Sequence, residues 1–202
     1  MSKVKLGLLI SGRGSNMKAI IEACQNNQIN AEVAVVISNN KHAPGIAIAK
    51  SYNIPTLALD IKAFASKLEY EEDIARILKG HNIDLICLAG YMRLLGKQFI
   101  QHFNHKIINI HPSLLPAFKG LNAQKQALEY GVKYTGCTVH FVDESLDGGP
   151  IIMQDVVAVL ASDDEASLTQ RILVQEHQLY PKAIQYLIEN YIKKEAYYES
   201  IN

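Results

Sequence analysis

Short apolar segments alternate with helical patterns through the first half of the chain. The apolar segments occupy residues 4–11, 31–38, 54–59, 83–90 and 106–111. Segments with apolar residues three or four positions apart separate them, at residues 16–27, 45–52 and 68–79. Short apolar strands joined by helices are typical of a parallel sheet that is covered on both faces. The alternation therefore predicts an α/β fold: an open, mostly parallel twisted sheet with helices on both faces.

The pattern changes in the second half of the chain. Two further strands are predicted at residues 135–142 and 150–159, joined by "DESLDGG". A connection this short cannot make a parallel crossover, so we expect the two strands to be antiparallel. A long helix is predicted from the acidic residues near Ser162 onward, with a kink or break at Pro181.

Composition excludes several classes of protein. The chain has 202 residues, of which 49% are hydrophobic and 20% charged, as expected for a single globular domain spanning residues 1–202. The 20 basic and 20 acidic side chains balance, so no nucleic-acid partner is predicted. We find no leader pattern and no apolar segment of about 18 residues, so we expect a cytoplasmic protein with no membrane partner. Three widely spaced cysteines indicate reduced, buried thiols.

The segment "SGRGSN" lies between the first predicted strand and the first predicted helix. Glycines allow a sharp turn, and free amide groups at a helix start attract an anion. Gly14, Ser15 and Asn16 are therefore candidate phosphate-binding residues. The segment is neither a Walker A motif nor a GxGxxG dinucleotide motif. The structural alternative is a tight turn that caps the helix.

The segment "NIHPS" ends a predicted strand with polar side chains. Asn109 and His111 are two residues apart, so they face the same side of the strand. The carboxyl ends of parallel strands are where open α/β sheets bind ligands. An amide can donate to a developing oxyanion, and an imidazole titrates near neutral pH. The alternative is a buried histidine satisfied by the backbone, with Asn109 fixing the next loop.

The loop "DESLDGG" provides a carboxylate, Asp147, directly before two glycines that allow a sharp turn. It could reach His111 and stabilise an imidazolium, although a simple hairpin connection explains the same sequence. His102 and His105 lack nearby companions that would complete a metal site, so no metal is predicted. His140 lies mid-strand and can belong either to the core or to the site.

Five segments taken together carry a family resemblance. They are "LLISGRGSN", "LAGYMRLL", "INIHPSLLPAFKG", "GCTVHFVDESLDGGPII" and "QEHQLYP", in this order between about Val4 and Leu187. The chain closely resembles the phosphoribosylglycinamide formyltransferases, the folate-dependent transformylases of purine synthesis. "HPSLLP" and "LDGG" are shared by the wider formyltransferase family, whereas "SGRGSN" is narrower. The resemblance implies a Rossmann-like formyltransferase fold.

The resemblance also implies roles for individual residues. Asn109, His111 and Asp147 match the catalytic trio. Gly14, Ser15 and Asn16 match the loop that holds the substrate phosphate, and Glu176 matches a residue that contacts the glycinamide portion. The implied folate pocket comprises Tyr91, Met92, Arg93, Leu94, Leu95, Val142, Asp143 and Glu144. A cis peptide before Pro116 is also typical of the family, and such a bond is allowed at any proline.

The implied reaction moves a formyl group from the co-substrate 10-formyltetrahydrofolate to the amine of glycinamide ribonucleotide, without a metal. Asn109 and protonated His111 would donate to the tetrahedral oxyanion, while Asp147 would stabilise the imidazolium and position water for proton transfer. These small molecules are the expected partners, and the protein is expected to be a monomer or weak homodimer.

Some features depart from the family or leave rivals open. The sequence "KGLNAQKQALEYG" replaces a histidine-rich stretch of some members, and the part of the family that helps to bind the folate glutamate tail falls near Lys67. A methionyl-tRNA formyltransferase or a formyltetrahydrofolate hydrolase would share "HPSLLP" and "LDGG" but usually has an extra domain, for which 202 residues leave no room. A nucleotide-binding module without catalysis is the rival from another class, and the intact trio argues against it.

Overall fold

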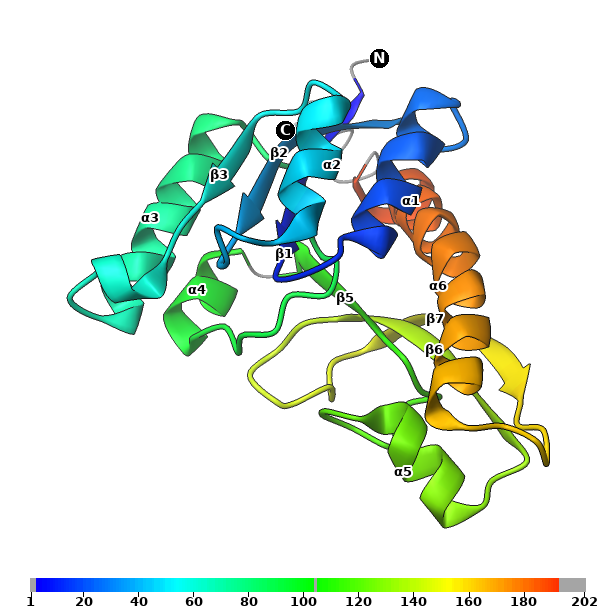
Figure 1. Ribbon diagram of the computed structural model, residues 1–202. Coiled ribbons are helices and arrows are strands. Elements are labelled where there is room, and N and C mark those ends of the chain that lie inside the picture. Colours follow the sequence, from blue (N-terminus) through cyan, green and yellow to red (C-terminus); the bar gives the residue numbers. More distant parts are fainter. Residues whose placement is uncertain (1–2, 104, 193–202) are drawn as a thin grey trace.

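A seven-stranded sheet forms the centre of the molecule (Figure 1). The structure is a computed structural model that describes residues 3–103 and 105–192. The strands are β1 (Val4–Ile10), β2 (Ala31–Ser38), β3 (Thr56–Ala58), β4 (Leu85–Leu88), β5 (Ile107–His111), β6 (Tyr134–Phe141) and β7 (Ile151–Ala158). Their order is β3-β2-β1-β4-β5-β6-β7, with parallel pairs from β3 to β5. β6 is antiparallel to both β5 and β7. The predicted mostly parallel sheet with antiparallel strands near the C-terminal part is confirmed.

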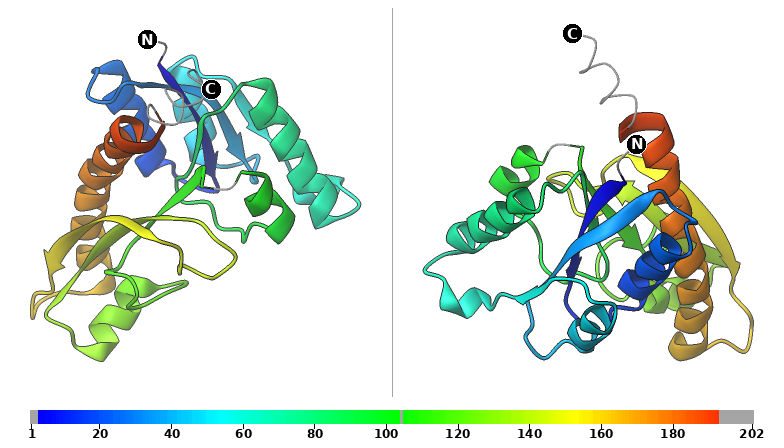
Figure 2. Two further views of the ribbon diagram at one scale, coloured as in Figure 1. Left: turned by 180° about the vertical axis from the view of Figure 1, so that it is seen from behind. Right: turned by 90° about the horizontal axis from the view of Figure 1, so that it is seen from above.

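Helices cover both faces of the sheet, as predicted (Figure 2). They are α1 (Ser15–Gln25), α2 (Pro44–Ser51), α3 (Lys67–Gly80), α4 (Lys97–His102), α5 (Ala123–Tyr130) and α6 (Glu165–Leu187), with shorter turns η1 (Ile61–Ala63) and η2 (Ile188–Ile192). Residues of α1, α2 and α6 pack in one apolar cluster, and residues of α3 and α4 pack in another. The apolar pattern of the sequence predicted neither α4 nor α5.

Alternate residues of β1 supply the two apolar clusters. Leu8 and Ile10 belong to the cluster that includes α1 and α6, whereas Leu9 belongs to the α3–α4 cluster. All three side chains are fully buried. This arrangement explains why the strand is continuously apolar, because both of its faces are covered.

The helix α6 continues through Pro181, so of the predicted kink or break the break is wrong, and the kink stays a prediction. A proline inside a helix removes one backbone hydrogen bond and crowds the preceding turn. Buried packing compensates here: the Tyr180 hydroxyl lies 3.1 Å from the carbonyl oxygens of both Leu88 and Ile108, its acceptors in β4 and β5. Tertiary contacts with the sheet therefore outweigh the local preference of proline.

The loops that follow β1 and β4 meet at the point where their connections lead to opposite faces of the sheet. The strands β1 and β4 are neighbours, but β1 leads to the α1 side of the sheet and β4 leads to the α4 side. The Ser11 amide donates to Gly90 O (3.1 Å), and the Met92 amide donates to Ser11 Oγ (2.8 Å). A divergence of this kind is the usual ligand position in open α/β sheets.

A buried threonine holds the segment that follows β5. The Thr138 hydroxyl donates to Ser113 O (2.7 Å) and accepts from the Leu115 amide (3.0 Å) and from Gln154 Nε2 (2.9 Å). The Leu115–Pro116 peptide in this segment is cis, as the family resemblance implied. Thr138 thereby links β6 to the backbone that follows His111.

Replacing Thr138 with valine should lower the free energy of unfolding by about 2–3 kcal/mol, because buried partners of the hydroxyl lose their hydrogen bonds while the side-chain shape is kept. Urea denaturation would measure the change. Thr135→Val is the matched control: Thr135 lies in the same strand, is equally buried, and its Oγ1 has no partner among the described residues. The control should be neutral or stabilising. Equal losses in both variants would contradict this account.

Candidate active site

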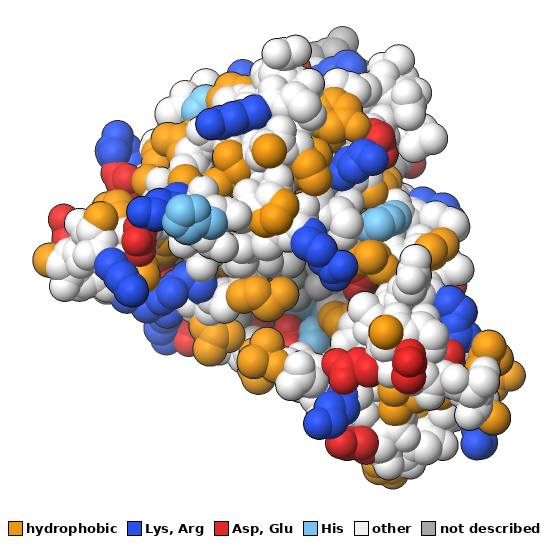
Figure 3. Space-filling view, viewed as in Figure 1, with side chains coloured by type: hydrophobic (Ala, Val, Ile, Leu, Met, Phe, Trp, Pro, Cys, Tyr) orange, Lys and Arg blue, Asp and Glu red, His pale blue; other side chains and the backbone are white. Residues whose placement is uncertain are grey.

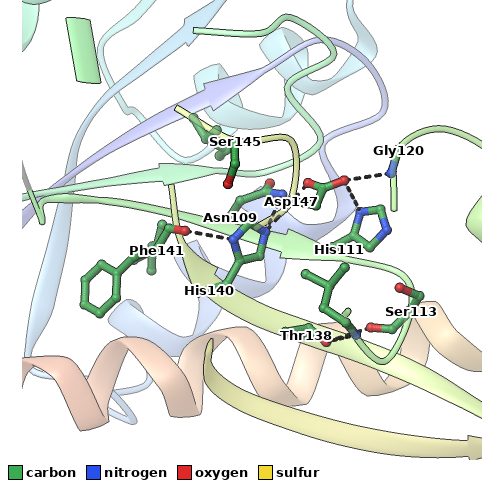
Figure 4. Close-up of polar contacts among 12 residues, drawn as sticks. Asn109, His111, Ser113, Gly120, Thr138, His140, Phe141, Ser145 and Asp147 are labelled. Carbon is green, nitrogen blue, oxygen red and sulfur yellow. Dashed lines mark hydrogen bonds and ion pairs between the residues drawn. The ribbon is translucent and has the colours of Figure 1, made fainter. Parts of the chain in front are cut away.

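Asn109 and His111 come together with Asp147 although the loop that carries Asp147 is distant in sequence (Figure 4). His111 is 5% exposed. Its Nε2 lies 2.9 Å from Phe118 O, and its Nδ1 lies 3.4 Å from Asp147 Oδ2. The structure therefore brings the predicted carboxylate next to the predicted imidazole.

The Asp147 carboxylate is fixed from several directions. Its Oδ2 accepts a hydrogen bond from the Gly120 amide (2.8 Å), and its backbone adopts a positive φ of 45°. Glu144 fixes the same loop to α4 through an ion pair with Lys97 (3.1 Å) and a hydrogen bond from Gln101 (3.2 Å). The loop is thus attached to both sides of the site rather than projecting freely.

Both ring nitrogens of His111 face oxygen acceptors. A backbone carbonyl accepts only, and so does an ionised carboxylate. The doubly protonated imidazolium is the form that donates to Phe118 O and also makes an ion pair with Asp147. The geometry therefore suits a histidine that carries a positive charge beside Asp147.

His140, for which the sequence left two interpretations open, is both buried and adjacent to the site. It is 2% exposed, and its Nε2 lies 3.3 Å from Asn109 Nδ2 and 3.8 Å from Asp147 Oδ1. Its Nδ1 lies 2.8 Å from Phe141 O. Burial lowers the pKa of His140 below its ordinary value. The signal that could have found it is strand register, which pairs His140 with Asn109 across β5 and β6.

The predicted phosphate loop leads directly into α1. Gly14 precedes the helix with a φ of 74°, and an added Cβ there would lie 2.9 Å from Gly45 Cα, so glycine is required. No side chain caps this helix start, and no acidic residue occupies its first turn. Ser15 is the first helical residue. Uncapped amide groups at a helix N-terminus are suited to an anion.

Asn16 and Glu176 form a buried polar pair beside this loop. Asn16 Nδ2 donates to Glu176 Oε2 at 2.7 Å, and the two residues are 8% and 6% exposed. Burial raises the pKa of Glu176 from 4.5 to about 7, and the bond from Asn16 partly opposes this. Asn16 Oδ1 is buried without a partner among the described residues. An orphan acceptor of this kind suits a ligand that brings a donor.

The predicted folate segment after β4 divides into buried and exposed side chains. Met92 and Leu94 are each 70% exposed, whereas Tyr91 is buried and its hydroxyl lies 3.1 Å from the Tyr70 hydroxyl. Leu95 packs against the α3–α4 cluster. The side chain of Tyr91 therefore supports the segment from within the core, and Met92 and Leu94 are its most exposed members.

Most of the remaining predicted residues contact neighbouring side chains or backbone groups. Val142 packs on the α3–α4 cluster, and its amide donates to Ile107 O at 2.9 Å. Asp143 accepts from the Ser145 amide at 2.8 Å, and the Ser145 hydroxyl keeps the pKa of Asp143 below its usual value. Lys67 lies 3.5 Å from Glu71, and Arg93 is partly exposed.

The surface around these residues mixes charges and apolar groups. Figure 3 shows basic side chains interspersed with acidic and apolar ones, and a hollow in which histidine and acidic side chains are visible.

Within residues 3–103 and 105–192, no group of three or more His, Cys, Asp or Glu side chains is arranged to hold a metal ion. In the same part of the chain, no helix is long and apolar enough to cross a bilayer.

Replacing Glu176 with glutamine should stabilise the protein at pH 8 by about 1–3 kcal/mol relative to the wild type, and much less at pH 5. The raised pKa means that the stability contributed by protonated Glu176 is complete below pH 4.5 and is lost as the pH rises through about 7. Glutamine keeps the neutral form at every pH.

Urea denaturation at pH 5 and pH 8 would measure this difference. Glu165→Gln provides the control, because Glu165 is exposed at the start of the same helix and its replacement should leave the pH dependence unchanged. A Glu176→Gln protein that is no more stable than the wild type at pH 8 would contradict the burial argument.

Comparisons with known proteins agree with this geometry. The formyl transferase family profile matches residues 4–184. The phosphoribosylglycinamide formyltransferase of Escherichia coli is 42% identical over 92% of this chain and 88% of its own length. A crystal structure of glycinamide ribonucleotide transformylase 1 from Symbiobacterium toebii superposes with a TM-score of 0.91 at 46% identity, covering 93% of this chain and 89% of that one.

Longer relatives contain a similar region. The trifunctional purine biosynthetic protein adenosine-3 of Drosophila melanogaster is 48% identical over 91% of this chain, and the human protein of that name is 44% identical over the same share. This chain spans only 14% and 18% of their lengths. The family match and the shared fold together show that the chain belongs to the formyl transferase family.

Proposed function

We propose that this chain transfers the formyl group of 10-formyltetrahydrofolate to the amine of glycinamide ribonucleotide, a step of de novo purine biosynthesis. This chain covers most of the length of two relatives, which are named phosphoribosylglycinamide formyltransferase and glycinamide ribonucleotide transformylase. The observation that carries the proposal is the contact of His111 with Asp147, beside the Asn109 amide. This set supplies an amide donor and a nearby positive charge for an oxyanion, and a carboxylate for the imidazolium.

The substrate phosphate is proposed to bind at Gly14, Ser15 and Asn16. The uncapped start of α1 offers amide donors to it, and the raised pKa of Glu176 reduces the negative charge nearby at neutral pH. The orphan Asn16 Oδ1 would accept a donor from the glycinamide ribonucleotide. Glu176 is proposed to contact the glycinamide portion.

The reduced folate is proposed to bind along residues 91–95 and 142–144. Exposed Met92 and Leu94 would pack against its rings, while Tyr91 and Val142 hold these two segments from the core side. Hydrogen bonds between Ser11 and the segment after β4 set the distance between the folate and the phosphate loop.

The proposed reaction begins when the substrate amine attacks the formyl carbon. The carbonyl oxygen becomes an oxyanion, which the Asn109 amide and the His111 imidazolium stabilise. The amine proton passes, through water held by Asp147, to the folate nitrogen, the carbon–nitrogen bond to folate breaks, and the carbonyl re-forms on the product. Holding both substrates in one geometry replaces a bimolecular encounter and can supply several kcal/mol of the barrier reduction. The residues involved need no covalent intermediate for this sequence.

We further propose that the chain acts as one catalytic domain in the cytoplasm, as a monomer or a weak homodimer. The continuous sheet from β3 to β7 supports a single domain, because the proposed site draws residues from both its parallel and antiparallel parts.

Purified protein should transfer formyl groups to glycinamide ribonucleotide in preference to water or methionyl-tRNA. Release of tetrahydrofolate with each acceptor in turn would measure the preference. The phosphate loop predicts that the ribonucleotide is the acceptor, and we expect at least about 100-fold selectivity, the size that fixed polar contacts supply. Faster transfer to water would favour a hydrolase, and faster transfer to methionyl-tRNA would favour that rival.

His111→Ala and Asp147→Asn should each lower kcat by about 100-fold or more, because each removes support for the oxyanion or for the imidazolium. The KM for glycinamide ribonucleotide should change by less than about threefold, since the phosphate loop is a separate element. His102→Ala, at an exposed histidine of α4, is the control and should retain wild-type turnover. Near-normal turnover in either site variant would show that its role is assigned wrongly.

A further inference from the structure

His140 is a buried polar residue that the proposed reaction does not use. It lies in β6 directly across from Asn109 of β5, and it is 2% exposed. The pairing of β6 with β7 shifts register between Val139 and His140. His140 therefore occupies an irregular position of the sheet, with its ring beside the Asn109 amide (Figure 4).

Two contacts define the protonation of the His140 ring. Nδ1 lies 2.8 Å from Phe141 O, and because a carbonyl oxygen only accepts, Nδ1 carries a hydrogen. Nε2 lies 3.3 Å from Asn109 Nδ2, and because an amide nitrogen only donates, Nε2 is the acceptor. The neutral Nδ1–H tautomer satisfies both contacts, and Asp147 Oδ1 lies farther from Nε2, at 3.8 Å.

The surroundings of the ring favour this neutral form. Desolvation by burial is the largest influence and lowers the pKa of His140. The positive charge of His111 acts in the same direction, while Asp147, Asp143 and the Phe141 carbonyl act against it. The ring therefore stays an acceptor at Nε2 beside a histidine whose contacts suit the charged form.

This tautomer determines how the Asn109 amide is presented. The oxygen and nitrogen ends of a carboxamide have nearly the same shape, so packing alone does not distinguish them. An acceptor at His140 Nε2 selects the nitrogen end. One Nδ2 hydrogen is then bound by His140, and the second has no protein acceptor among the described residues.

We propose that His140 is a positioning residue that orients the Asn109 carboxamide, so that the free Nδ2 hydrogen donates to the oxyanion of the formyl transfer. This inference rests on the proposed function for its chemistry and on strand pairing for its geometry. A charged His140 would instead present a hydrogen to the amide, turn the amide oxygen toward the ring and withdraw the donor.

Three substitutions at position 140 test the proposal. His140→Leu keeps the bulk but removes the acceptor, and kcat should fall about 10-fold or more. His140→Asn keeps a polar group near the Phe141 carbonyl but does not reach Asn109, so kcat should fall by a similar factor. His140→Gln places an acceptor oxygen near the position of Nε2 and should recover kcat to within about threefold of the wild type. The KM for glycinamide ribonucleotide should change little in all three.

A double-mutant cycle separates positioning from a general structural role. If His140 acts through Asn109, His140→Leu should lower kcat by less than about twofold in an Asn109→Ala background. Thermal unfolding would confirm that each variant is folded. A full loss of kcat from His140→Leu in the Asn109→Ala background would overturn the proposal, as would a folded His140→Gln protein as inactive as His140→Leu.

Nitrogen-15 NMR gives a readout that does not depend on catalysis. At pH 7 the His140 ring should show a protonated Nδ1 and an unprotonated Nε2, and His140→Leu should shift the side-chain amide resonances of Asn109. A charged ring or an Nε2–H tautomer would overturn the proposal, and so would unchanged Asn109 resonances. If the wild type transfers no formyl group to any acceptor, the proposed function fails, while these spectra still decide the orientation of Asn109.

Discussion

The antiparallel pairing of β6 with β5 is the interaction on which the candidate site depends. It sets His140 opposite Asn109 and Thr138 opposite His111. Thr138 then fixes the backbone after His111, and the chain beyond β6 returns Asp147 to within 3.4 Å of the His111 ring. A parallel strand in this place would reverse its direction beside β5 and would not keep these pairings.

The periodicity of the sequence was sufficient to predict the sheet but not all of its partners. Continuous apolar strands such as β1 and β2 were readily predicted, because burial on both faces leaves a simple pattern. The six-residue helix α4 is too short for a distinct period, and the effect of Pro181 was overruled by the contacts of Tyr180 with the sheet. Local patterns carry no information about such distant contacts.

The candidate site shows the same division. The shared face of Asn109 and His111 followed from their spacing. The approach of Asp147 to His111 was one of two interpretations of the sequence, and the hydrogen bond from the Gly120 amide to Asp147 fixes the loop in that position. The family resemblance predicts Tyr91 in the folate pocket, and the structure adds a contact of its hydroxyl with the Tyr70 hydroxyl in the core. Register decided the place of His140, and register cannot be read from one strand alone.

Burial and pairing assign different protonation states to neighbouring groups. Desolvation by burial is the largest influence on both His140 and Glu176 and favours their neutral forms, raising the pKa of the carboxyl and lowering that of the imidazole. His111 instead lies between a carbonyl oxygen and a carboxylate, which together suit a cation. The proposed formyl transfer would use this combination: a positive charge near the oxyanion, one neutral ring that orients an amide, and little negative charge beside a phosphate. Strand pairing holds Asn109, His111 and His140, whereas hydrogen bonds outside the sheet hold Asp147 and Glu176. Because these groups are fixed before substrates arrive, the protein need not reorganise its dipoles during the proposed reaction, and such preorganisation is a main source of electrostatic catalysis.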